Sequence, residues 1–563
     1  MSVRFWLKQN KSVILFLLLL LYLYFRGTSD HGLIDPIEGL NASISLHMSA
    51  TGNYFEPHLG SSLTAGKSLG FWWLSSFALK IFGWEEFALR FWSAFAGLLM
   101  IFISARSAQR FNNASKRKSW LGASICASMA ICFATSQLAS PSAMSALLTS
   151  LIMFGLVKTP QNKNWLILTH SALVLSMILN GYDVIFYTLM SLFIFGVTQN
   201  DYELLKNFFT YPAGIIISII GLGCYILLLM QTNPLILHFM RCQDLTLPAK
   251  NYFLMPLVVI ISFMPYAGFV IRAVYEILQD SKKYILFETQ DSQELQNEYE
   301  YEYEKQILSE QEIFEKKVFQ SRFLMMIWGL VFLVFGLLTC NYLLLSSCVV
   351  PFSGILGDLI DEWLKNKHLY SIRMSIVINM PLILITIILI IPVLVITVPA
   401  LEKSVMSLIP YSGFLILFWL ASWYYARTKQ IFKWSRNVIA VGLLSLMPLA
   451  GVFDLVAEAT SIQKQGLVLR ELIRKDDTII QYHENHPSIY FYTFRDSQLI
   501  NAPLLEGVQQ KRFVTDEKML HALWRGKARV FLLIPSEELL QNILPSNVFN
   551  IAESDKMLLL SNQ

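Results

Sequence analysis

Residues 12–25 read Ser-Val-Ile-Leu-Phe-Leu-Leu-Leu-Leu-Leu-Tyr-Leu-Tyr-Phe and carry no charged side chain. Lys8 and Lys11 precede this run and no Ala-x-Ala cleavage site follows it, which favours a retained transmembrane helix over a signal peptide. Apolar runs of about 18 residues or more recur along most of the chain, and each can cross a hydrocarbon core about 30 Å thick. The pattern predicts a polytopic α-helical membrane protein.

The composition excludes a large soluble enzyme. Of the 563 residues, 55% are hydrophobic and only 15% are charged, whereas soluble domains carry roughly 25% charged residues. The six cysteines form no CxxC or Cys/His spacing that would indicate zinc, so we interpret them as small buried hydrophobic residues. The cysteines therefore predict no metal site, and nothing in the chain points to a nucleic-acid partner.

The apolar runs predict about thirteen transmembrane helices. They lie near 11–27, 86–105, 118–136, 139–157, 164–180, 183–198, 211–231, 252–276, 323–340, 342–360, 375–398, 404–425 and 435–455. If the N-terminus is cytoplasmic, the inner connections hold most of the Lys and Arg residues, as short cytoplasmic loops do. An odd number of spans then places the C-terminal region outside.

Three polar segments interrupt this pattern. Residues 28–85 form an outer loop with two amphipathic stretches, 37–50 and 69–83, which we expect to lie along the membrane surface. Residues 278–322 predict a charged helical insert on the inner side, which is typical of a solvated face. We therefore divide the chain into a transmembrane domain, 1–455, and an outer domain, 456–563.

The outer domain is expected to be a small α/β unit. Short alternating runs begin at Thr478, Ser488, Ala528 and Met557 and predict strands. Helical stretches are expected at 516–524 and 536–543. Strands that alternate with helices are typical of an α/β layer.

The outer loop holds the densest group of candidate functional residues. Asp35 and Glu38 begin its first amphipathic stretch, and Lys67 begins its second. A carboxylate can deprotonate an acceptor, and a lysine at a helix start can hold a phosphate beside the helix N–H groups. The alternative is structural: Glu38 would be a first-turn helix charge and Lys67 a membrane anchor.

The loop resembles the first periplasmic loop of the bacterial aminoarabinose transferase family, whose pattern runs D-E-x-x-Y-A-x-I-A-x-x-M, then P-R-L-N-G, then Y-x-E-K-P-P-L-x-Y-W. Residues 38–48 and 51–60 match the first two blocks, and Gly66-Lys67-Ser68-Leu69 takes the place of the third. Residues 81–90, IFGWEEFALR, resemble the family's L-F-G-x-x-E-F-A-x-R. His238-Phe-Met-Arg241 is similar to H-x-x-R-F, and residues 529–535 are similar to a closing strand.

The resemblance implies a GT-C-like scaffold and a polyprenyl-phosphate-sugar glycosyltransferase of the bacterial inner membrane, related to protein mannosyltransferases. In family terms Lys67, with His238 and Arg241, would bind the donor phosphate. Glu38, with Asp35 as the second candidate, would orient or deprotonate the acceptor, and Tyr342 would line the cavity.

This chain also departs from the family pattern. Ile37 replaces the aspartate of the acidic pair, and Gly66 replaces the glutamate before the lysine. The latter change leaves dependence on a divalent metal open. The acceptor implied is lipid A, another glycolipid or a protein. Two other functions remain open: a transporter or flippase for a lipid-linked sugar, and a catalytically inactive relative of the transferases.

Overall fold

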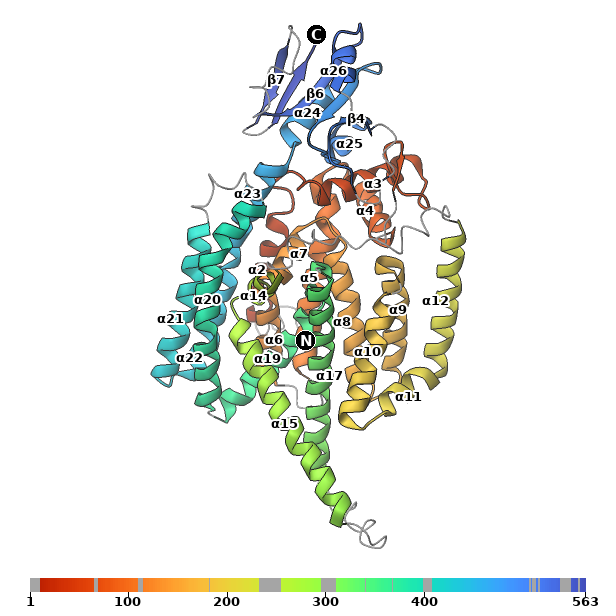
Figure 1. Ribbon diagram of the computed structural model, residues 1–563. Coiled ribbons are helices and arrows are strands. Elements are labelled where there is room, and N and C mark those ends of the chain that lie inside the picture. Colours follow the sequence, from red (N-terminus) through yellow and green to blue (C-terminus); the bar gives the residue numbers. More distant parts are fainter. Residues whose placement is uncertain are drawn as a thin grey trace.

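The computed structural model is mostly helical, with a sheet at one end (Figure 1). The structure describes residues 11–64, 69–109, 115–181, 183–231, 255–294, 310–339, 341–366, 368–397, 408–505, 508, 513–514, 517–536, 548–554 and 557–563.

The helical unit and the outer loop contain the following elements. They are α2 (Lys11–Arg26), α3 (Ile37–Thr51), β1 (His58–Leu59), β2 (Ser62–Leu63), α4 (Leu69–Phe82), α5 (Glu86–Ala108), α6 (Lys116–Ser128), α7 (Ala130–Gln137), α8 (Ser142–Lys158), α9 (Trp165–Asn180), α10 (Asp183–Gln199), α11 (Glu203–Thr210), α12 (Pro212–Gln231), α14 (Met255–Ser262), α15 (Ala267–Glu294), α17 (Glu310–Leu338), α18 (Tyr342–Ser346), α19 (Val349–Lys365), α20 (Leu369–Thr397), α21 (Leu408–Arg427), α22 (Ile431–Leu444) and α23 (Leu446–Thr460).

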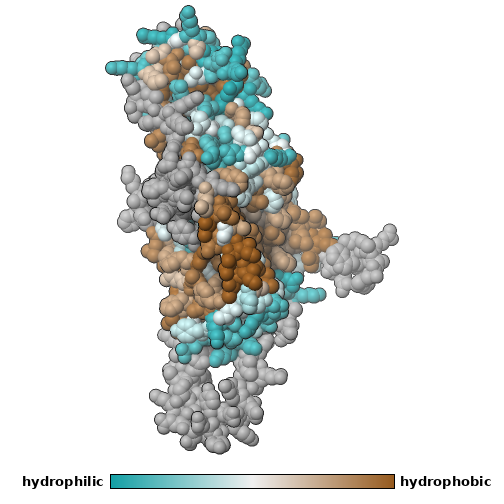
Figure 2. All heavy atoms as spheres, turned by 90° about the vertical axis from the view of Figure 1, so that its right-hand side faces the viewer, coloured by the Kyte–Doolittle hydropathy of each residue, from teal (hydrophilic) through white to brown (hydrophobic). Residues whose placement is uncertain are grey.

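The helices have the length and composition of membrane spans. Within the described ranges, five are long and apolar enough to cross a membrane, or up to eight if each bent pair counts as one span. The bent pairs are α6 with α7 (59°), α11 with α12 (60°) and α14 with α15 (91°). Figure 2 shows a hydrophobic band between two hydrophilic ends, as expected for a membrane protein. The predicted count of about thirteen spans stays a prediction.

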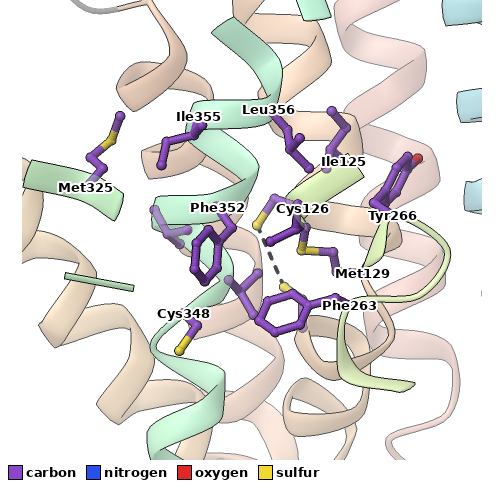
Figure 3. Packing of buried hydrophobic residues seen from close by; sticks show 14 of the residues in the cluster. Ile125, Cys126, Met129, Phe263, Tyr266, Met325, Cys348, Phe352, Ile355 and Leu356 are labelled. Atoms are coloured by element: carbon purple, nitrogen blue, oxygen red, sulfur yellow. Dashed lines mark hydrogen bonds between the residues drawn. The ribbon is translucent and has the colours of Figure 1, made fainter. Parts of the chain in front are cut away.

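The helical core is built around α19, which packs against α5, α6 and α17. Figure 3 shows side chains of α6, α17 and α19 together with Phe263 from the connection between α14 and α15. The rings of Phe263 and Phe352 cross edge to face with centroids 5.5 Å apart. Two glycines allow α6 and α19 to touch through their backbones. A Cβ added at Gly357 would lie 2.6 Å from the backbone nitrogen of Gly122.

Buried carboxylates join three helices at the end of the bundle away from the sheet. Asp358 of α19 is ion-paired with Lys118 of α6 (2.6 Å) and with Arg322 of α17 (2.8 Å). Asp361, one turn later, contacts Arg117 of α6 and Lys365 (2.8 Å). Because a buried charge is costly unless paired, these contacts hold α6, α17 and α19 together.

The first amphipathic stretch of the outer loop forms α3, most of which is packed inside the protein. Its predicted position along the membrane surface stays a prediction. Nine residues of α3 are buried, among them Glu38, Ser43 and Ser45. Polar residues on this helix are buried because they face partners in the protein: the hydroxyl of Ser43 donates to the carbonyl oxygen of Pro487 (2.7 Å). In α4, by contrast, Phe77 and Ile81 are exposed.

The described parts of the charged segment 278–322 belong to two helices of the bundle. Its first part continues α15 to Glu294, and its last part belongs to α17, which begins at Glu310. Residues 295–309 lie outside the described part of the chain. The segment therefore lengthens two bundle helices, and Figure 1 shows α15 extending beyond the other helices at the end away from the sheet.

The C-terminal region forms a six-stranded mixed sheet in the order β5-β4-β3-β6-β8-β7. Strands β5, β4, β3 and β6 run parallel to one another, whereas β8 pairs antiparallel with both β6 and β7. The elements are α24 (Gln463–Leu472), β3 (Thr478–Tyr482), α25 (Ser488–Thr493), β4 (Ser497–Ile500), β5 (Phe513–Val514), α26 (Glu517–Trp524), β6 (Val530–Pro535), β7 (Phe549–Glu553) and β8 (Met557–Ser561).

The predicted strand at residue 488 is wrong. Residues 488–493 form helix α25, in which all six side chains are buried. The alternation of polar and apolar residues does not indicate secondary structure here, because α25 packs against both α3 and α24 and has no side that faces solvent. The predicted helix at 516–524 corresponds to α26, whereas most of 536–543 lies outside the described residues.

Replacing Gly357 by Ala is expected to lower the midpoint of thermal unfolding in detergent, because the new methyl group would press on the backbone of α6. Overpacking of this kind costs about 1–3 kcal/mol. The matched control is Gly223→Ala in α12, where an added Cβ meets nothing within 4 Å. An unchanged midpoint in Gly357→Ala would contradict the close helix contact.

Candidate active site

Glu38 and Arg90 form an ion pair that is closed to solvent. Glu38 lies in the first turn of α3 and Arg90 in the first turns of α5, and both side chains have 0% relative exposure. Nε of Arg90 donates to Oε1 of Glu38 (2.9 Å) and Nη2 donates to Oε2 (2.7 Å). The pairing is bidentate, the strongest geometry between these two groups.

The guanidinium of Arg90 uses its whole donor capacity. Beyond the two bonds to Glu38, Nη1 donates to the carbonyl oxygens of Thr28 (3.1 Å) and His31 (2.9 Å), and Nη2 donates to that of Gly32 (3.0 Å). A guanidinium has five N–H groups, and each of them has an acceptor here. The arginine therefore fixes the path of the chain between α2 and α3.

The carboxylate of Glu38 is equally engaged. Oε1 also accepts from the backbone N–H of Ala139 (2.6 Å), and Oε2 accepts from that of Ile34 (2.9 Å). Burial raises the pKa of Glu38, but the charge of Arg90 and these hydrogen bonds outweigh it, so the pKa is lowered. The group is an anion with no free face toward an acceptor, and this geometry favours a structural role. Its predicted role as a base stays a prediction.

Asp35, one helical turn before Glu38, faces the C-terminal sheet domain. Its Oδ1 accepts from the backbone N–H of Ser488 (3.2 Å), and its Oδ2 accepts from the Ser488 hydroxyl. Oδ2 also lies 3.4 Å from Nδ1 of His486, whose Nε2 lies 2.8 Å from Glu484. Asp35 is thus 9% exposed and forms part of the contact between the loop and the domain.

His486 is held between two carboxylates. Burial lowers its pKa, but the contacts with Asp35 and Glu484 raise it further, to about 9. The imidazole is therefore protonated at neutral pH and carries a charge that joins the domain to the loop.

A second contact between loop and domain surrounds a small cavity. The backbone N–H of Ser61 donates to Asp496 (3.0 Å), and Nδ1 of His47 lies 3.0 Å from the hydroxyl of Tyr490. The cavity between β2 and α25 has a volume of about 40 Å³ and is lined partly by Gln481, Tyr490 and Asp496. It can hold a water molecule or two but no sugar ring.

The remaining predicted site residues are only partly placed. Lys67, His238 and Arg241 lie outside the described residues. Tyr342 is the first residue of α18, and its side chain also lies outside them. In the part of the chain that is described, no group of three or more His, Cys, Asp and Glu side chains could hold a metal ion.

Sequence reasoning did not single out Arg90 or His486. A signal for Arg90 existed, because a lone arginine in the apolar run 86–105 needs a buried acid. No local signal marks His486, because its partner Asp35 lies about 450 residues earlier in the chain.

Comparison with known proteins shows a shared fold. No family model and no curated protein matches the sequence. The crystal structure of ArnT from Cupriavidus metallidurans in the apo state matches with a TM-score of 0.73 and 14% identity, over 99% of this chain and 98% of that chain. The chain has the ArnT fold. A second ArnT structure, bound to undecaprenyl phosphate, matches with a TM-score of 0.70 and 14% identity, over 98% of each chain.

The resemblance inferred from the outer loop is therefore confirmed at the level of the fold. The match to ArnT extends over the helical unit and the C-terminal sheet alike, since it covers 99% of the chain. At 14% identity the two proteins share the fold, but the similarity does not assign a role to any single residue of this chain.

Replacing Glu38 by Gln is expected to destabilise the protein by about 3–5 kcal/mol, because it leaves the buried guanidinium of Arg90 without its counter-charge. Denaturant unfolding in detergent measures this loss. Glu85→Gln, at an exposed position at the start of α5, is the control and should change little. If Glu38→Gln kept full stability and lost only transferase activity, Glu38 would be a base and not a structural residue.

The contact between loop and domain is expected to weaken as pH rises. The pKa of His486 is raised above its ordinary 6.5 to about 9, so its contribution is fully present below about pH 6.5 and is lost as pH rises through about 9. Hydrogen exchange of α3 and α25, corrected for the intrinsic pH dependence, should show less protection at pH 9.5 than at pH 6.5. His486→Gln should remove this difference; a difference that persists would contradict the assignment.

Proposed function

We propose that this chain is a membrane glycosyltransferase that moves a sugar from a polyprenyl-phosphate donor to an acceptor. The observation that carries the proposal is the ArnT fold over almost the whole length of the chain, together with the binding of undecaprenyl phosphate by ArnT. A polyprenyl phosphate has an apolar tail and an anionic head. An apolar helical bundle with a polar loop at one end suits both parts.

The proposed reaction is a single displacement. The acceptor oxygen attacks the anomeric carbon, the bond between this carbon and the donor phosphate oxygen breaks, and polyprenyl phosphate leaves. We assign Lys67 to the donor phosphate, where its charge would stabilise the leaving group. His238 and Arg241 are proposed as further phosphate contacts, and Tyr342 as a residue of the cavity wall.

The burial of Glu38 bears on the acceptor. A hydroxyl acceptor must lose a proton to a base, whereas a phosphate acceptor is already ionised near pH 7 and needs none. Because all four hydrogen-bonding positions of Glu38 are filled, we propose that it holds the loop in place. This arrangement suits a phosphate acceptor such as that of lipid A. For a hydroxyl of another glycolipid or a protein, Asp35 is the candidate base.

We place the reaction on the periplasmic face of the bacterial inner membrane. The distribution of Lys and Arg supports a cytoplasmic N-terminus. The outer loop and the C-terminal sheet lie at the same end of the helical unit, as Figure 1 shows. The domain and the loop with the candidate residues would then share the periplasmic side.

The purified protein is expected to transfer sugar from undecaprenyl-phosphate donors to lipid A or another glycolipid, followed by the mass of the lipid product. Lys67→Ala should lower the rate about 100-fold or more, because loss of one preorganised group at the leaving oxyanion has an effect of this size. Lys464→Ala, which removes an exposed lysine of α24, is the charge-matched control and should leave the rate unchanged.

Two other results would overturn the proposal. Movement of the intact lipid-linked sugar across vesicles without any product, unaffected by Lys67→Ala, would identify a transporter. Binding of the donor with neither transfer nor transport would identify an inactive relative. Glu38→Gln should be tested in parallel with its stability, so that loss of folding is not mistaken for loss of catalysis.

A further inference from the structure

A larger cavity lies at the end of the helical unit away from the C-terminal sheet. Its volume is about 370 Å³, within the range of about 300–1,000 Å³ found for small-molecule sites. Four segments enclose it: the end of α8 with the turn that follows, the end of α10, the start of α11 with the residues just before it, and the first half of α17. Figure 1 places α11 at this end, remote from the outer loop and its candidate residues.

The cavity wall carries charges of both signs. Lys163, in the turn after α8, and Lys317 of α17 supply two ammonium groups, whereas Asp201 and Glu203 at the start of α11 supply two carboxylates. Amide side chains, such as that of Asn207, add neutral donors and acceptors. A wall of this kind is suited to a ligand that is itself zwitterionic, since a singly charged ligand would face two like charges.

The carboxylates are held in place by their neighbours. Oδ1 of Asp201 accepts from the backbone N–H of Glu203 (3.0 Å), and its Oδ2 accepts from Nε2 of Gln320 (3.3 Å). Oε1 of Glu203 accepts from Nδ2 of Asn207 (3.4 Å). Each carboxylate has about four acceptor positions, so both keep capacity for a cationic group in a fixed orientation.

The floor of the cavity is apolar. Leu156, Phe195, Leu204 and Leu324 line it, and each is buried. A free polar solute would leave this floor uncovered, whereas the glycerol and upper acyl carbons of a lipid would cover it.

The surroundings place the cavity at the level of lipid head groups. The short helix α11 bends 60° away from α12 and buries Leu204 and Phe208. Tyr202, just before the helix, and Phe209 within it are exposed (47% and 56%). Exposed aromatic residues beside the ends of apolar helices are typical of the membrane–water interface. In the predicted orientation this interface belongs to the cytoplasmic leaflet.

We propose that this cavity binds the head group of an aminophospholipid of the phosphatidylethanolamine class. Lys163 and Lys317 would face the phosphate, and Asp201 and Glu203 would face the ammonium. A primary ammonium can donate three hydrogen bonds to the carboxylates, whereas a trimethylammonium can donate none. The site therefore selects ethanolamine over choline, and both over anionic lipids that lack an ammonium.

The test is lipid binding to delipidated protein, followed by native mass spectrometry. Dioleoyl-phosphatidylethanolamine is expected to bind about tenfold more tightly than dioleoyl-phosphatidylcholine or dioleoyl-phosphatidylglycerol, as loss of one charge-assisted contact implies. The double variant Asp201→Asn with Glu203→Gln, which removes the two carboxylates that would face the ammonium, should lose this preference. Glu471→Gln is the matched control, because it removes the charge of an exposed glutamate of α24 that does not line the cavity.

The same head group could come from a membrane lipid or from a soluble molecule, and competition with soluble glycerophosphoethanolamine distinguishes these two sources. Selective lipid binding that millimolar glycerophosphoethanolamine does not displace supports the membrane source. Equal binding of the three lipids, or binding of the soluble head group alone, would overturn the proposal. The unfolding midpoints of the variants should equal that of the wild type. A lower midpoint would show that a variant lost its lipid selectivity because it unfolds.

Discussion

The arrangement of the outer loop depends on one buried charge. Arg90 enters the bundle near the start of α5, where an unpaired guanidinium would be prohibitively costly. Its five hydrogens reach Glu38 and three backbone carbonyls of the loop, and Glu38 in turn accepts from the backbone of Ala139 between α7 and α8. A single pair thus joins α5, the loop and the α7–α8 connection. Moving any of them would leave a charge or a backbone group without its partner in a water-poor environment.

Most helices of the helical unit can be predicted from the sequence, because a backbone in lipid must satisfy its own hydrogen bonds and therefore forms helices. Apolar runs must form helices in lipid, so α2, α5, α9 and α10 follow the predicted ranges closely. The bends between α6 and α7 and between α14 and α15 were not predictable from hydropathy, which reports length and not direction. Helix α25 was mistaken for a strand because complete burial removes the polar–apolar alternation on which a sequence-based assignment depends.

The candidate site was harder to predict than the fold. Local patterns located Asp35 and Glu38, but only the three-dimensional contacts distinguish them. Glu38 faces Arg90 and the bundle, whereas Asp35 faces Ser488 and His486 of the sheet domain. Neither partner of Asp35 is near it in sequence, so no periodicity or spacing could indicate the contact. The same holds for the cavity beside α11, whose charged residues Lys163, Asp201, Glu203 and Lys317 come from segments far apart in the sequence.

The contact between α3 and α25 also constrains the order in which the molecule assembles. Asp35 and Ser488 are separated by 453 residues. At about 5–20 residues per second, synthesis of the intervening chain takes roughly 20–90 s. Throughout this interval the buried polar face of α3 has no partner and must be covered by water, lipid or a chaperone. Strand β8 lies between β6 and β7 but follows both in sequence, so the sheet closes only after residues 557–561 have been synthesised. The outer loop, although among the first segments made, is therefore among the last to reach its final structure.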